Sequence, residues 1–170
     1  MAEFSLLRRK KLILKFTPLS IVLEALAFLV LNASFLIMDR LYPALPETVP
    51  TAFAPDGSVL GTGLKEVTLI HPIFAVFIFI ILLCANIVVR QSCPPDRPLP
   101  VLRTVLDAVS VAKTLFLAYE AGRTWYAMSL RPAPAWTLYA LIGSEAVVIA
   151  VTAALIRLRK RRSEADGNAG

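Results

Sequence analysis

Hydrophobic residues gather along this chain in four long segments, at 16–38, 70–89, 105–128 and 136–156. At a rise of 1.5 Å per residue, about 20 helical residues cross a hydrocarbon core of about 30 Å. Backbone groups find no water partner in lipid, so we expect each segment to be a helix. No stretch alternates apolar and polar residues as the strands of a membrane barrel do. The sequence therefore predicts an all-α integral membrane protein, a four-transmembrane-helix bundle.

Composition supports this fold class. Hydrophobic residues make up 57% of the 170 residues, against roughly 45–50% in soluble domains. Four spans in so short a chain need one another as neighbours, so we expect one transmembrane domain over residues 1–162. The remaining residues, 163–170, are polar and are expected to form a disordered tail.

The net charge of +6 follows from a cluster of basic residues on one side of the predicted membrane. Most of the 18 Lys and Arg precede the first span, separate the second from the third, or follow the fourth. This distribution predicts that both termini are cytoplasmic. The charge therefore indicates topology and contact with anionic membrane lipids rather than nucleic-acid binding.

The predicted external loop spans residues 40–66 and contains four prolines, so no helix is expected there. Pro55, Asp56 and Gly57 form a strong turn signal. The residues TAFA before this turn and SVL after it are expected to pair as a short β-hairpin. The loop is interpreted as a cap over the outer end of the bundle, with a partner-binding role or a lid role as the alternatives.

Polar residues in the third span lie on one side of the predicted helix. At 100° per residue, Asp107, Ser110 and Thr114 fall within a narrow arc, with Lys113 and Glu120 beside it. This side of the helix must avoid lipid, because an intramembrane charge is costly unless it is paired or faces the bundle interior.

Depth in the membrane suggests partners for these charges. Lys113 and Glu145 lie near the middle of two helices that a short turn makes neighbours, so an ion pair between them is predicted. Glu120 is three residues from Arg123, and such residues are neighbours on a helix. The same argument pairs Arg103 with Asp107, four residues later.

Other intramembrane polar residues have less evident partners. Glu24 has no obvious basic partner at its depth, so it is expected to be protonated or hydrogen-bonded to Asn86 or Ser20. The complete predicted intramembrane polar network is Glu24, Asn32, Asn86, Asp107, Lys113, Glu120, Arg123 and Glu145.

Residue size predicts which helices pack and which face lipid. Small residues such as Ala112 and Gly122 on the third span favour close helix packing. The second span is bulky and β-branched, so it is expected to be the most lipid-exposed helix.

Catalytic motifs are absent from the sequence. It has no HExxH, phosphate-binding Gly-rich loop or GxSxG motif, and its one histidine, His71, is interpreted as an interfacial residue at a helix start. Cys84 and Cys93 are too far apart along the chain to form a disulfide. We therefore predict no catalytic residue, no cofactor and no metal site.

Three functions remain open. The first is a non-catalytic accessory or assembly subunit of a larger membrane complex, with lipids and other membrane subunits or further copies of itself as partners. The second is a small transporter or proton-conducting oligomer that uses the intramembrane carboxylates. The third is a lipid-modifying membrane enzyme, for which His71 and Asp56 are the candidate acid–base pair.

Overall fold

The computed structural model describes residues 14–92 and 99–167 and is mostly helical. Its four α-helices are α1 (Pro18–Leu41), α2 (Ile70–Gln91), α3 (Leu99–Met128) and α4 (Ala135–Gly167). Two strands, β1 (Thr48–Phe53) and β2 (Val59–Leu64), lie between α1 and α2. Short 3₁₀ helices, η1 (Tyr42–Ala44) and η2 (Lys65–Leu69), flank these strands.

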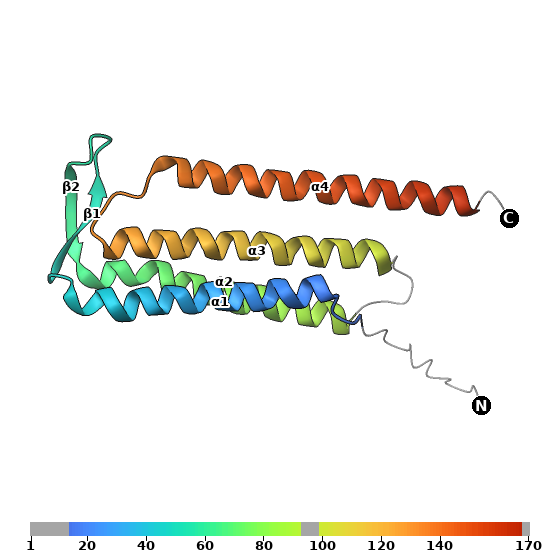
Figure 1. Ribbon diagram of the computed structural model, residues 1–170, viewed down its shortest axis with the longest axis horizontal. Coiled ribbons are helices and arrows are strands. Elements are labelled where there is room, and N and C mark those ends of the chain that lie inside the picture. The colour runs from blue at the N-terminus through green and yellow to red at the C-terminus, as the bar shows by residue number, and fades with distance from the viewer. Residues whose placement is uncertain (1–13, 93–98, 168–170) are drawn as a thin grey trace, which may run out of the picture.

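The four helices lie side by side, with the hairpin at one end and both ends of the chain at the other (Figure 1). Three of them, α1, α2 and α4, are long and apolar enough to cross a membrane. The fourth, α3, is not among them, because charged residues interrupt its apolar sequence. It packs against all three of the others.

The position of α3 follows from its buried face. Its buried residues recur every three or four positions and include Ser110, Lys113, Leu117, Glu120 and Thr124, the spacing of one helix face. Polar side chains therefore face α1 and α2, and α3 forms the interior of the assembly.

The predicted hairpin is confirmed. Strands β1 and β2 pair antiparallel from Thr48↔Leu64 to Phe53↔Val59. Gly57 supplies the positive φ of 86° that the turn requires.

Next to Gly57, hydrogen bonds from the hydroxyl and backbone N–H of Ser58 lower the pKa of Asp56. These hydrogen bonds therefore weaken only at acid pH, where the carboxylate is protonated.

Buried apolar residues form two clusters at different levels of the bundle. The first, at the level of Leu117, joins Ala27 and Leu31 of α1 with Ala75 of α2. The second, built on Leu45, lies under the hairpin with Val49 and Met128. The second cluster anchors the loop to the ends of α1 and α3, as expected for a cap.

Helix boundaries and exposure differ from the predictions in three respects. Helix α4 continues to Gly167, into the predicted disordered tail, because nothing in that polar segment breaks a helix before its glycine. Short 3₁₀ turns form within the proline-rich loop. Helix α4 rather than α2 is the most exposed, since no residue in its apolar window is buried.

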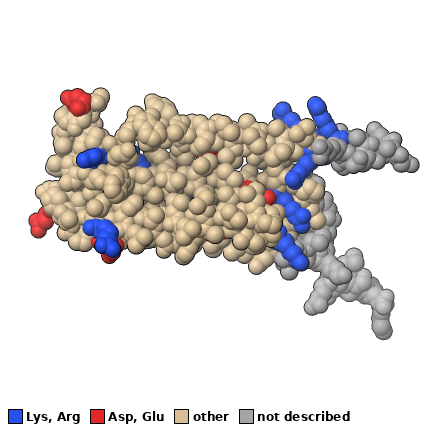
Figure 2. Space-filling view, viewed as in Figure 1, with Lys and Arg blue, Asp and Glu red and all other residues tan. Residues whose placement is uncertain are grey.

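Charged residues separate toward the two ends. Figure 2 shows Lys and Arg gathered at the end where the two termini lie. Exposed basic residues there include Arg103, Arg157, Arg159 and Arg161. The long surface between the two ends shows few charged residues on this face (Figure 2), and exposed apolar side chains such as Leu29, Phe77 and Ile149 belong to the helices that form it.

Candidate functional site

A buried polar cluster, here called the inner network, joins α1, α2 and α3. Its centre is an ion pair between Lys113 of α3 and Glu24 of α1. Ser110, one turn before Lys113, lies 3.1 Å from the other oxygen of Glu24. Lys113 is 2% exposed, and its ammonium group also lies 5.1 Å from the ring centre of Phe79. The positive charge of Lys113 is therefore paired with a carboxylate and lies against an aromatic ring inside the protein.

Arg90 extends this network into α2. Its guanidinium donates to Asn86 Oδ1 at 2.6 Å and to Ser20 Oγ at 2.9 Å. A third nitrogen donates to the carbonyl of Lys15 at 3.2 Å. Arg90 is 1% exposed, so its planar set of donors is used almost entirely inside the protein.

Two contacts close the network. Asn86 donates to Ser110 at 3.1 Å and so connects Arg90 with the Glu24 cluster. Asp107 lies 3.7 Å from Arg90 and accepts a hydrogen bond of 3.0 Å from Thr17, the N-cap of α1. Among the described residues, no buried side-chain nitrogen or oxygen atom lacks a hydrogen-bond partner.

A second polar site lies near the hairpin end of α3, here called its outer end. His71 Nδ1 lies 2.9 Å from Glu120 Oε2, and Glu120 is 5% exposed. The apolar cluster around Leu117 separates this pair from Lys113. Lys113 and Glu120 are two turns apart, about 10 Å along the helix axis.

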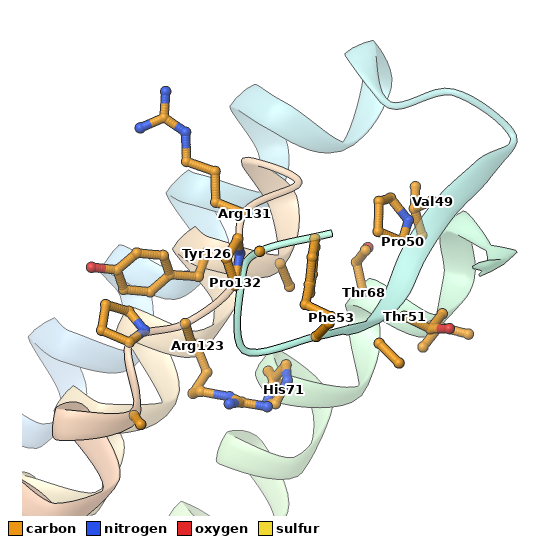
Figure 3. Close-up of a pocket in the computed structure, with 18 of the residues that line it drawn as sticks. Val49, Pro50, Thr51, Phe53, Thr68, His71, Arg123, Tyr126, Arg131 and Pro132 are labelled. Atoms are coloured by element: carbon orange, nitrogen blue, oxygen red, sulfur yellow. The ribbon is translucent and has the colours of Figure 1, made fainter. Parts of the chain in front are cut away.

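An outer pocket of about 750 Å³ opens beside this pair. Its walls come from the hairpin, η2, the start of α2, the end of α3 and the turn that leads into α4. In the view of Figure 3 the side chain of Arg123 extends toward His71. Arg123 is half-buried and makes no hydrogen bond or ion pair with a residue of the described ranges. Its guanidinium is therefore available to a ligand.

A groove of about 340 Å³ runs between α3 and α4. Leu115, Gly122, Trp136 and Leu141 are among the mainly apolar residues that line it. Arg123 and Tyr126 line both the groove and the outer pocket, so the two spaces meet at these residues.

Comparisons with protein-family models, with curated proteins and with solved structures found no match. The chemistry of these sites therefore carries the functional argument.

Several predicted pairings are wrong. Lys113 pairs with Glu24 rather than with Glu145, because its side chain leaves α3 on the face toward α1 and not toward α4. For the same reason, the statement that Glu24 lacks a basic partner is wrong. Glu145 is half-buried on α4 and has no partner among the described residues.

The two pairings predicted along α3 are also wrong. Glu120 binds His71 instead of Arg123. Asp107 lies near Arg90, while Arg103 is exposed. In both cases a group on α2, buried Arg90 or half-buried His71, replaces a neighbour on the same helix. The carboxylate that it pairs with is largely shielded from water, which strengthens the electrostatic attraction.

Three further expectations differ from the structure. Asn32 donates to the carbonyl of Phe28 on its own helix and stays outside the network. Gly122 borders open space, so it does not mark a close helix contact. Asp56 accepts hydrogen bonds from Ser58 at the hairpin tip and does not contact His71.

The two cysteines form no disulfide that the structure describes. Cys84 is a free thiol, and Cys93 lies outside the described residues.

Sequence reasoning counted Arg90 with the topological charges and interpreted His71 as a helix-start residue, and it missed the buried carboxylates and amide that these two residues contact. Arg90 stands at the end of the second span, where a basic residue is expected for topology alone. Its spacing of four residues from Asn86 was the available signal, since such residues are neighbours on a helix.

The Lys113–Glu24 pair predicts strong coupling between two helices. Lys113→Met and Glu24→Gln should each destabilise the bundle by about 3–5 kcal/mol, because each leaves an unpaired buried group. The double variant should lose clearly less than the sum, as measured by unfolding in detergent.

Glu145→Gln provides the control for this cycle. Combined with Lys113→Met, it should give an additive loss, because the two side chains do not interact. Additivity for Lys113 with Glu24, or coupling of Lys113 with Glu145, would contradict the assignment.

Proposed function

We propose that this chain is a non-catalytic, four-span membrane protein that serves as an accessory or assembly subunit of a larger membrane complex. The observation that carries the proposal is Glu145, a carboxyl near the middle of the apolar segment 136–156 of α4, with no partner among the described residues. An intramembrane charge costs about 2.5–3.5 kcal/mol on insertion scales, and such residues pair or line a polar space. A polar group from another subunit would supply the missing partner.

The four-span arrangement has support from the packing of α3. Its 30 residues extend about 45 Å, enough to cross a bilayer. Its Lys113 and Glu120 are buried against α1 and α2, away from lipid. The basic residues at the opposite end from the hairpin favour cytoplasmic termini.

The exposure of α4 also supports a binding role. Its apolar window has no buried residue, and its small residues Ala146, Ala150 and Ala154 are exposed on it. Small residues at a spacing of four allow a second helix to approach closely. Next to them, Glu145 would give such a contact a polar anchor.

The transporter alternative has less support. A proton path would have to connect the inner network with the His71–Glu120 pair, and the apolar cluster around Leu117 lies between them. Every buried side-chain nitrogen and oxygen atom of the described residues also has a hydrogen-bond partner. These features fit groups that hold helices together better than groups that release protons.

The enzyme alternative has less support for a similar reason. A carboxylate that orients a histidine occurs in hydrolases, and His71 with Glu120 has this geometry. No Ser, Thr or Cys side chain of the described residues is hydrogen-bonded to His71, so the pair lacks the nucleophile that this chemistry needs.

The proposed topology is tested with single cysteines in a variant without Cys84 and Cys93. Cysteines at Ser58 and Ala133 should react with an impermeant maleimide in intact cells, and a cysteine at Gly167 only after permeabilisation. Labelling of Ser58 and Ala133 from opposite sides would mean that α3 does not cross the membrane.

The proposed partner contact is tested by photo-crosslinking of the full chain in its native membrane. A photoreactive residue at Ala146 on α4 should give a crosslinked heteromeric product, and one at Ile80 on exposed α2 should not. Glu145→Leu should remove most of this product, whereas Ser144→Ala, the neighbouring control, should retain it.

Two results would contradict the accessory role. One is a product that contains copies of this chain alone, which would favour the oligomeric transporter. The other is crosslinking that is equal in the wild type and in Glu145→Leu.

A further inference from the structure

We propose that the outer pocket and the α3–α4 groove together bind one membrane lipid with an anionic head group. In this arrangement Arg123 binds the head group, and the acyl chain lies between α3 and α4. The proposal concerns a ligand of the chain itself and does not depend on the accessory role proposed above.

The charge of the lining selects an anion. Arg123, Arg131 and His71 line the outer pocket, and no Asp or Glu is among the lining residues of either space. Glu120, the nearest carboxylate in the sequence, is engaged by His71. Arg123 is thus left with its donors free, and guanidinium groups bind phosphate or carboxylate in a bidentate manner.

The groove supplies the apolar half of the site. It is open where Gly122 lacks a side chain, since a Cβ there would meet no atom within 4 Å. Leu115, Ala118, Trp136 and Leu141 offer apolar surface along it. Both spaces have volumes within the range of about 300–1,000 Å³ that small-molecule sites occupy.

The two halves are joined in the order that a lipid requires. The pocket lies beside the hairpin, at the end of the bundle that also contains Trp125, Tyr126 and Trp136. Tyrosine and tryptophan residues favour the head-group level of a bilayer, so the pocket is expected at that level. The groove continues from Arg123 along α3 and α4 toward Leu115 and Ser144. A head group at Arg123 would therefore leave its chain directed into the membrane interior.

Figure 3 supports Arg123 as the head-group ligand over Arg131. In Figure 3 the side chain of Arg123 extends toward His71, whereas the guanidinium of Arg131 is directed away from both residues. Arg131 is exposed, so water would compensate its charge without a ligand. Half-buried Arg123 has less access to water and gains more from an anion.

The test uses the full chain in neutral detergent, titrated with phosphatidylglycerol or with phosphatidylcholine of the same acyl chains. Native mass spectrometry counts bound lipids, and the thermal midpoint reports their stabilisation. The wild type should retain one phosphatidylglycerol more tightly than phosphatidylcholine. Arg123→Gln should weaken this lipid about tenfold or more, because a hydrogen bond to a charged group is lost.

Matched variants separate this site from unspecific attraction to the basic end of the protein. Arg161→Gln removes the same charge from an exposed position there and should leave the tight lipid in place. Gly122→Leu should fill the groove and displace the lipid, whereas Gly143→Leu, at another open glycine outside the groove, should not. Ala118→Leu repeats the groove test if Gly122→Leu does not fold.

Three outcomes would overturn the proposal. The first is equal retention of the two lipids by the wild type, and the second is wild-type phosphatidylglycerol binding by Arg123→Gln or by both groove variants. The third is stabilisation by inorganic phosphate that matches the lipid and is lost in Arg123→Gln, because the site would then bind a free anion.

Discussion

The structure depends on the neutralisation of the charges on α3. A helix that carries Asp107, Lys113 and Glu120 is costly to expose to lipid. Each of these groups finds a partner on α1 or α2: Arg90 and Thr17 for Asp107, Glu24 for Lys113, and His71 for Glu120. These contacts fix both the rotation of α3 and its position along the bundle axis, since a shift by one residue would turn the charged side chains away from their partners. Buried polar groups thus act here as determinants of helix docking.

Polar contacts and apolar packing alternate along the axis of the bundle. The inner network holds α1, α2 and α3 together near one end, the cluster around Leu117 follows, and the His71–Glu120 pair lies beyond it. The outer cap completes the series with Leu45, Val49 and Met128. Helix α4 has no part in these contacts among the described residues, which leaves its Glu145 and its exposed surface for other interactions.

Much of the fold could be predicted from the sequence, because lipid imposes simple rules on length and hydrophobicity. Three apolar helices and the hairpin follow from residue patterns alone. The polar side of α3 was also evident, since helical periodicity groups Ser110 and Thr114 with the charges. The direction of each side chain determines which helix it contacts, and depth alone does not contain that information.

The candidate sites were therefore harder to predict than the helices. Lys113 and Glu145 share a similar depth, but they leave adjacent helices in different directions. Arg90 was interpreted as a topological charge because its burial depends on Ser20 and Lys15, far away in the sequence. The outer pocket also required the structure, because its walls come from the hairpin and three helices.

The most direct test of this account measures how far α3 inserts into microsomal membranes in different chain contexts. Glycosylation acceptors on either side of the helix report its insertion. The account predicts weak insertion of isolated α3, efficient insertion within the full chain, and a loss of that gain when Glu24→Leu removes the partner of Lys113. Equal insertion of α3 in all three settings would contradict the claim that partners on α1 and α2 allow α3 to insert despite its charges.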